Sequence, residues 1–183
     1  MTLPCLFGRS RQFHRELETK WHRLYRLAYA WCHDTQLASD LVQESIVKAL
    51  GNRKQLRESQ AMDAWLFTIL ANCWRDHIRR SREMTDIDDV PLVHASNPET
   101  ECGQLEIVCR VRAAIAELAI DQRQIITLVD LEGLAYDEVA LVLGIPVGTV
   151  MSRLFRARRD LKRRLNEAET ARNGQGQRIR SVI

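Results

Sequence analysis

The chain has 183 residues, of which 45% are hydrophobic and 28% charged, and its formal net charge is +3 at pH 7. This composition is ordinary for a soluble globular protein and excludes a strongly polybasic chain. The five cysteines form no CxxC pair, which argues against a disulfide framework. No apolar stretch reaches about 18 residues, so the sequence predicts no insertion into a membrane.

The N-terminal region carries Arg9, Arg11 and Arg15 and has no long apolar run. It therefore does not resemble a secretory signal. We expect a cytoplasmic protein with reduced thiols.

Helical periodicity dominates the chain, and no alternating strand pattern stands out. The first half predicts three helices, near 12–33, 35–50 and 61–82. Thr35 is the expected N-cap of the second helix, and Gly51-Asn52 its end. The second half predicts four shorter helices, near 103–118, 121–132, 136–143 and 147–166.

An acidic segment separates the two groups of helices. From Glu83 to Glu106 the chain has seven acidic residues and no Lys or Arg, and it includes Pro91 and Pro98. Such a change in composition is typical of an interdomain linker. The sequence thus predicts an all-α fold of two small helical domains joined by an acidic linker. The predicted boundaries are 11–84 and 105–167 for the domains, 85–104 for a flexible linker and 168–183 for a disordered tail.

The segment 135–154 reads AYDEVALVLGIPVGTVMSRL and predicts a helix-turn-helix. Gly144 can adopt the left-handed conformation of a tight interhelical turn, and Pro146 can end the first helix and precede the second. Val150 and Leu154 lie at i, i+4 spacing, so they are expected to pack inward. From Val147 to Leu165 the chain has seven basic residues and one acidic residue.

The second helix of this motif presents a polar and basic outer face. An α-helix fits the major groove of B-DNA, where Arg can pair with guanine and other bases neutralise phosphates. The alternative is a solvated basic helix within a bundle. We favour DNA recognition because the turn, the spacing and the charge agree.

Two N-terminal motifs complete the pattern. They read DLVQE at 40–44, and AWLFTILAN at 64–72 followed by RDHIRR at 75–80. Together with the helix-turn-helix they resemble regions two and four of the bacterial extracytoplasmic-function (ECF) sigma factors, over roughly 20–82 and 108–165. The order of the two regions, with an acidic linker between them, makes the resemblance specific.

The resemblance implies an alternative sigma factor that binds core RNA polymerase, recognises −35 and −10 promoter elements and aids promoter melting. Its implied partners are the clamp helices of the largest polymerase subunit, the flap, promoter DNA and an anti-sigma factor. The implied polymerase-binding residues are Asp40, Leu41, Gln43, Glu44 and Lys48. Leu41 also fits a core position, and the polar residues of this set also fit a solvated helix face.

The same resemblance assigns the DNA contacts. The loop near 52–62 and the helix after it match the −10 region, with Asn72, Arg75, Arg79 and Arg80 at contact positions. The −35 set is Thr149, Ser152, Arg153, Phe155, Arg156, Arg158 and Arg159. Ser152, Phe155 and Arg156 match base-contacting positions, and the others suit backbone contacts. Two departures from the family pattern are Met151, where Arg is frequent, and Ala135, where Ser often caps the helix.

Other chemistry is less well supported. Cys73 and His77 lie at i, i+4 and suggest a shared metal, but their spacing matches no zinc motif, and Cys73 also suits a core position. Trp65 and Trp74 could stack on bases, although we favour a core role for Trp65. We expect no enzyme, no cofactor and no metal site. A stand-alone helix-turn-helix regulator is the main alternative function, and a metal- or redox-sensing protein is a weaker one.

Overall fold

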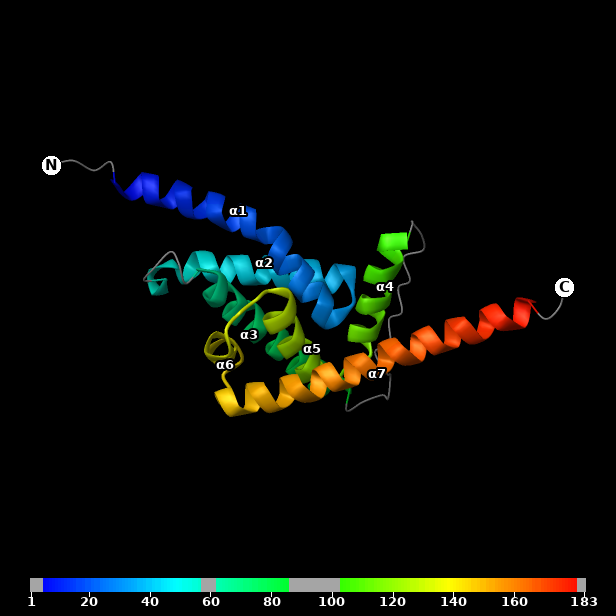
Figure 1. Cartoon of the computed structure of the whole chain (residues 1–183). Helices are drawn as coiled ribbons and strands as arrows, with labels where there is room; N and C mark the ends of the chain where they lie inside the picture. Colours follow the sequence, from blue (N-terminus) through cyan, green and yellow to red (C-terminus); the bar gives the residue numbers. More distant parts are fainter. Residues whose placement is uncertain (1–4, 57–61, 86–102, 181–183) are drawn as a thin grey trace. The chain divides into compact units, whose positions relative to one another are not determined.

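The computed structural model describes residues 5–56, 62–85 and 103–180 (Figure 1). Side chains are described for 12–53, 55–56, 62–83 and 107–167. All regular elements in the described residues are helical, which confirms the predicted all-α class. The chain divides into two compact units, and each is treated separately below. Most of the predicted linker, 86–102, lies outside the described residues.

Three helices build the N-terminal unit: α1 (Cys5–Cys32), α2 (Thr35–Gly51) and α3 (Met62–Thr85), with a 3₁₀ turn, η1 (Arg53–Gln55), after α2. Each of the three helices packs against the other two. Their buried faces follow the helical period, as in Leu24, Ala28 and Trp31 of α1. Trp31 is fully buried and is among the largest side chains in the core of this unit.

The turn between α1 and α2 differs slightly from the sequence prediction. Asp34, not Thr35, is the N-cap of α2: its carboxylate accepts a hydrogen bond from the Leu37 amide at 2.8 Å. Asp and Thr both cap well, so the sequence alone does not choose between adjacent candidates. At the other end, the Asn52 amide donates to the Lys48 carbonyl at 3.0 Å, as the predicted helix end requires.

A charged cluster fastens α1 to the start of α3. The Asp63 carboxylate pairs with Lys20 at 2.7 Å and with Arg23. The Arg23 guanidinium also lies over the Phe67 ring, 5.2 Å from its centre. An acid in the first turn of α3 is favourable beside the positive end of the helix dipole. This cluster orients α3, which carries the predicted −10 residues.

The C-terminal unit contains α4 (Gly103–Ala116), α5 (Ile120–Ile126), the π-helical segment η3 (Thr127–Leu131), most of α6 (Tyr136–Leu143) and α7 (Val147–Arg180). The helix α7 packs against α4 and α5. Leu118, Ile126 and Ala157 form one buried cluster, with Leu161 packed against it. Alanine at 157 keeps the distance between the packed helices short.

Two helices are longer than the sequence predicts. The helix α1 begins at Cys5 instead of Gln12, directly after Pro4, a residue that is favourable at the start of a helix. The helix α7 continues to Arg180 and so covers most of the segment predicted to be a disordered tail. The stretch 167–172 contains Ala, Glu and Arg and no Pro or Gly, so it favours helix continuation.

Among the described residues, no single helix is long and apolar enough to cross a membrane. One pair, Tyr136–Leu143 with Val147–Glu167, meets that criterion by length and composition only when its two helices, bent by 101°, are counted together.

Candidate nucleic-acid interface

The turn between α6 and α7 has the backbone geometry of a helix-turn-helix. Gly144 has a φ of +65°, in the left-handed region that the sequence predicts for it. The Ile145 amide donates to the Ala140 carbonyl at 3.0 Å, which closes the end of α6. The Pro146 carbonyl accepts from the Thr149 amide at 2.9 Å and so starts α7. The bend of 101° lies in the range of this motif.

A nearby side chain compensates for the missing side-chain cap at Ala135. The Ala135 side chain cannot cap α6, but the Glu138 carboxylate accepts a hydrogen bond from the Ala135 amide at 2.9 Å. This contact is half of a capping box, in which the third helical residue reaches back to the cap. It satisfies one of the amides that the start of a helix leaves without a partner.

The first turns of α7 present one face inward and one outward. Val150, Leu154 and Ala157 are buried, as the periodicity predicts. Ser152, Arg156 and Arg159 are exposed on the opposite face. Phe155 is 71% exposed, an unusual position for a large aromatic side chain. Among the described side chains Arg156 has no acidic partner, and its Nε donates to the Ser152 carbonyl at 3.3 Å.

The remaining predicted −35 arginines are held at the sides of α7. The Arg153 guanidinium lies 3.6 Å from the Asp121 carboxylate of α5. The Arg158 Nε donates to Asp130 of η3 at 3.1 Å, and its Nη2 donates to the other carboxylate oxygen at 2.5 Å. The Asp130 carboxylate raises the pKa of Arg158. The predicted set thus contains outward residues, of which Arg156 has no acidic partner among the described side chains, and two arginines paired with neighbouring helical segments.

The predicted polymerase-binding residues of α2 differ in their exposure to solvent. Asp40 and Gln43 are exposed, whereas Leu41 is 2% exposed and belongs to the core. Leu41 therefore supports the fold and is not available for contact with a partner. Val47, one turn after Gln43, is an apolar residue outside this predicted set, and it is 68% exposed. An apolar residue on a polar helix face is the signal that could have identified it.

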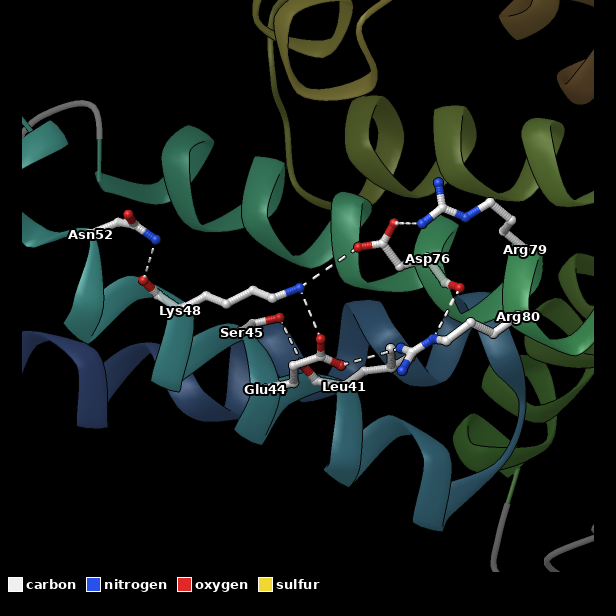
Figure 2. A network of polar contacts seen from close by, with 8 residues as sticks. All are labelled: Leu41, Glu44, Ser45, Lys48, Asn52, Asp76, Arg79 and Arg80. Atoms are coloured by element: carbon white, nitrogen blue, oxygen red, sulfur yellow. Dashed lines mark hydrogen bonds and ion pairs between the residues drawn. The ribbon is translucent and has the colours of Figure 1, made fainter.

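Ion pairs connect α2 to the predicted −10 residues of α3 (Figure 2). The Lys48 ammonium lies 2.8 Å from Glu44 and 3.8 Å from Asp76. The Glu44 carboxylate also lies 3.9 Å from the Arg80 guanidinium, and the Asp76 carboxylate lies 3.2 Å from the Arg79 guanidinium. The hydrogen bond to Glu44 is the main reason that the pKa of Lys48 is raised. Residues from both predicted sets therefore share one network.

The arginines of this network keep much of their surface in water. The side chains of Arg79 and Arg80 are 70% and 59% exposed, and Asn72 and Arg75 are exposed on the same helix. Exposed guanidinium groups can exchange such weak pairs for phosphate contacts. Part of the predicted −10 loop, 57–61, lies outside the described residues.

The tryptophans and the candidate metal ligands have structural partners. Trp74 is 6% exposed, and its ring stacks on His77 at 5.7 Å. Trp65 is half-buried and lies 6.5 Å from the Phe13 ring. Cys73 is a fully buried free thiol. Within the described part of the chain, no three His, Cys, Asp or Glu residues are grouped to hold a metal ion.

Both units match known sigma-factor regions. The family described as "Sigma-70 region 2" matches residues 21–83, and "Sigma-70, region 4" matches residues 110–161. The RNA polymerase sigma-H factor of Pseudomonas aeruginosa is 34% identical, over 79% of this chain and 81% of the relative. The ECF RNA polymerase sigma factor EcfG of Rhodopseudomonas palustris is 36% identical, over 80% of this chain and 81% of the relative.

Solved structures agree with the sequence matches. The sigma factor RpoE of Bartonella quintana, in complex with the anti-sigma factor NepR, has a TM-score of 0.77 and 31% identity, over 85% of this chain and 98% of that one. CnrH in complex with the cytosolic domain of CnrY has a TM-score of 0.63 and 26% identity, over 86% and 90%. Sigma factors are not enzymes, and a stand-alone regulator is not favoured. The chain belongs to the ECF sigma factors and is an alternative sigma factor that directs transcription initiation.

Proposed function

We propose that this sigma factor divides promoter recognition between its two units. The unit of residues 11–84 binds the clamp helices of core polymerase and the −10 element. The unit of residues 105–167 binds the −35 element and the flap. One observation carries this proposal: Ser152, Phe155 and Arg156 are exposed on the outward face of α7, the second helix of the helix-turn-helix.

In the −35 complex, Arg156 donates paired hydrogen bonds to a base, because its guanidinium is exposed and has no acidic partner among the described side chains. Ser152 and Phe155 contact neighbouring base edges. Thr149, Arg153, Arg158 and Arg159 contact phosphates, which supplies salt-dependent affinity without sequence preference.

In the −10 complex, Asn72, Arg75, Arg79 and Arg80 contact the opened strand along the exposed face of α3. On α2, Asp40, Gln43, Glu44 and Lys48 contact the clamp helices, with the buried Leu41 holding the helix in place. The protein adds specificity to the catalysis of the polymerase and has no catalytic activity of its own. Its place of action is the cytoplasm.

Run-off transcription with core polymerase and fragments of the source genome tests this proposal. We expect transcripts from a small set of fragments only when both proteins are present, together with melting of DNA near the start site. A folded protein that supports no transcript from any fragment would contradict the proposal. So would tight binding of the free protein to palindromic duplexes, which is the behaviour of a stand-alone regulator.

We also propose that an anti-sigma factor holds this protein inactive. Two solved relatives carry such partners in their structures, NepR with RpoE and CnrY with CnrH. Affinity purification of the tagged protein from unstressed cells should recover a partner that inhibits run-off transcription when it is added back. Recovery of core polymerase alone would contradict this part of the proposal.

A further inference from the structure

The two sides of the recognition helix α7 are braced by carboxylates from the helices beneath it. At 3.6 residues per turn, Ser152, Arg156 and Arg159 point away from the buried face, whereas Arg153 and Arg158 lie on opposite flanks. Asp121 holds Arg153 at 3.6 Å, and Asp130 holds Arg158 through two hydrogen bonds. The Asp130–Arg158 pair is closer than the Asp121–Arg153 pair. The need to neutralise a buried charge does not explain it, because the Arg158 side chain is 51% exposed.

The contact between Asp130 and Arg158 fixes the direction of the guanidinium. It uses Nε and Nη2, one edge of the planar group. A guanidinium has five N–H donors in a rigid fork, so the donors on Nη1 and the second donor on Nη2 face away from the carboxylate. An arginine held in this way keeps these three donors for other acceptors, such as the oxygens of a phosphate.

The backbone beneath this pair is also unusual. Asp130 lies in η3, where the Glu132 amide donates to the Thr127 carbonyl at 3.0 Å, five residues back. A π-turn holds one residue more than an α-turn, so it changes the direction in which the following side chains point. Asp130 is the main reason that the pKa of Arg158 is raised, and a side-chain hydrogen bond and charge interaction with Tyr136 of α6 raise it further. Side chains from two elements, η3 and α6, thus converge on a single exposed arginine of α7.

We propose that Asp130 is a positioning residue for −35 binding: its carboxylate holds the Arg158 guanidinium on the flank of α7 so that the outward donors meet a DNA phosphate. The proposal rests on the proposed role of α7 in −35 recognition. The proposal predicts an unusual direction for the change in DNA affinity. Loss of an acidic charge near a DNA-binding surface normally strengthens DNA binding, whereas loss of Asp130 is expected to weaken it.

The test compares wild-type and Asp130→Asn proteins, each bound to core polymerase, on a genomic fragment that the wild-type holoenzyme transcribes. We expect Asp130→Asn to bind about three- to tenfold more weakly and to lower the slope of log affinity against log salt by about one, as for one lost phosphate contact. In the Arg158→Ala background, Asp130→Asn should weaken binding no further, because its effect acts through Arg158.

Asp137→Asn is the matched control, since it removes the same charge from the exposed first turn of α6. We expect it to bind DNA as tightly as the wild type or slightly more tightly. Thermal unfolding of each variant checks the fold, and Asp130→Ser replaces Asp130→Asn if the latter is unstable. The proposal would be overturned if Asp130→Asn bound DNA as tightly as the wild type. It would also be overturned if Asp130→Asn lowered the DNA affinity equally in the wild-type and Arg158→Ala backgrounds. Transcription by the wild type tests the proposed function separately.

Discussion

At the scale of single residues, the arginines of α7 differ in whether an acidic side chain pairs with them. Arg156 is exposed, and among the described side chains no acid neutralises it. We predict that Arg156→Ala weakens binding to the −35 element by about 1–3 kcal/mol, because a two-point contact with a base is lost. Competition between promoter fragments that differ at each −35 position measures the effect. The preference should relax at one position only.

Arg159 supplies the comparison for this prediction. Its side chain is 66% exposed, and its guanidinium lies 3.3 Å from Asp160 of the same helix. A phosphate contact from this position carries no sequence information. Arg159→Ala should therefore weaken binding to every fragment by a similar factor. If Arg156→Ala also lowered affinity for all fragments equally, Arg156 would be a backbone contact and our assignment to a base would be wrong.

At the scale of elements, the turn between α6 and α7 depends on one conformation. A Cβ at Gly144 would meet no atom within 4 Å, so the cost of Gly144→Ala comes from its φ of +65° alone. We predict a loss of about 1–2 kcal/mol in unfolding free energy. Gly148 has equal space but lies inside α7, so Gly148→Ala should stabilise the protein by about 0.5–1 kcal/mol. Denaturant unfolding compares the two, and destabilisation of similar size in both would contradict this explanation.

The contact between α5 and α7 makes stability depend on pH. The Gln122 amide donates to Asp160 at 2.9 Å, and this bond, helped by Arg159, lowers the pKa of the Asp160 carboxyl. A carboxyl with a lower pKa in the folded state adds stability above its unfolded pKa of about 3.9, and this stability is lost as the pH falls through the folded value.

Gln122→Ala should therefore raise the pKa of Asp160 toward its ordinary value, which an NMR titration of the carboxyl carbon detects. The variant should also lose less stability than the wild type between neutral pH and acid. Gln36→Ala serves as the control, because Gln36 contacts Asp40 in the other unit. If Gln122→Ala leaves the Asp160 titration unchanged, the Gln122 amide is not the cause of the lowered pKa of Asp160.

The elements that local chemistry specifies were predictable from the sequence. The helical period identifies the buried residues of α7, and Gly144 and Pro146 identify its turn. The N-cap of α2 was predicted one residue late, because Asp34 and Thr35 are both good caps. The pairs that join different elements, such as Asp130 with Arg158, were missed. They depend on helix packing and on the π-turn, which leave no periodic signal in the sequence.

At the scale of the whole molecule, basic charge is concentrated on the helix proposed to bind the −35 element. The net charge is only +3, yet seven basic residues lie between Val147 and Leu165. A single helix with few phosphate contacts binds DNA weakly at physiological salt. The proposed polymerase contacts on α2 supply the second anchor, and two linked sites give a combined affinity that neither has alone. Promoter binding should therefore depend on the polymerase.

This division of labour predicts two kinds of defect that sigma concentration can distinguish. We expect Asp40→Asn to lower the affinity for core polymerase, so transcription should recover, by mass action, when the variant is added in excess over a fixed amount of core. Arg156→Ala acts after the holoenzyme has formed, so excess sigma factor should not restore its transcription. Run-off assays over a range of sigma concentrations measure both.

Glu18→Gln is the matched control for Asp40→Asn, because Glu18 is an exposed acid of α1 outside the proposed polymerase-binding set. It should leave the concentration that gives half-maximal transcription unchanged. Direct measurement of core binding, by fluorescence anisotropy of a labelled sigma factor, should show a loss for Asp40→Asn and none for Arg156→Ala. The opposite pattern, with Arg156→Ala rescued by excess protein, would place polymerase contacts on the recognition helix and refute the assignment of the two anchors.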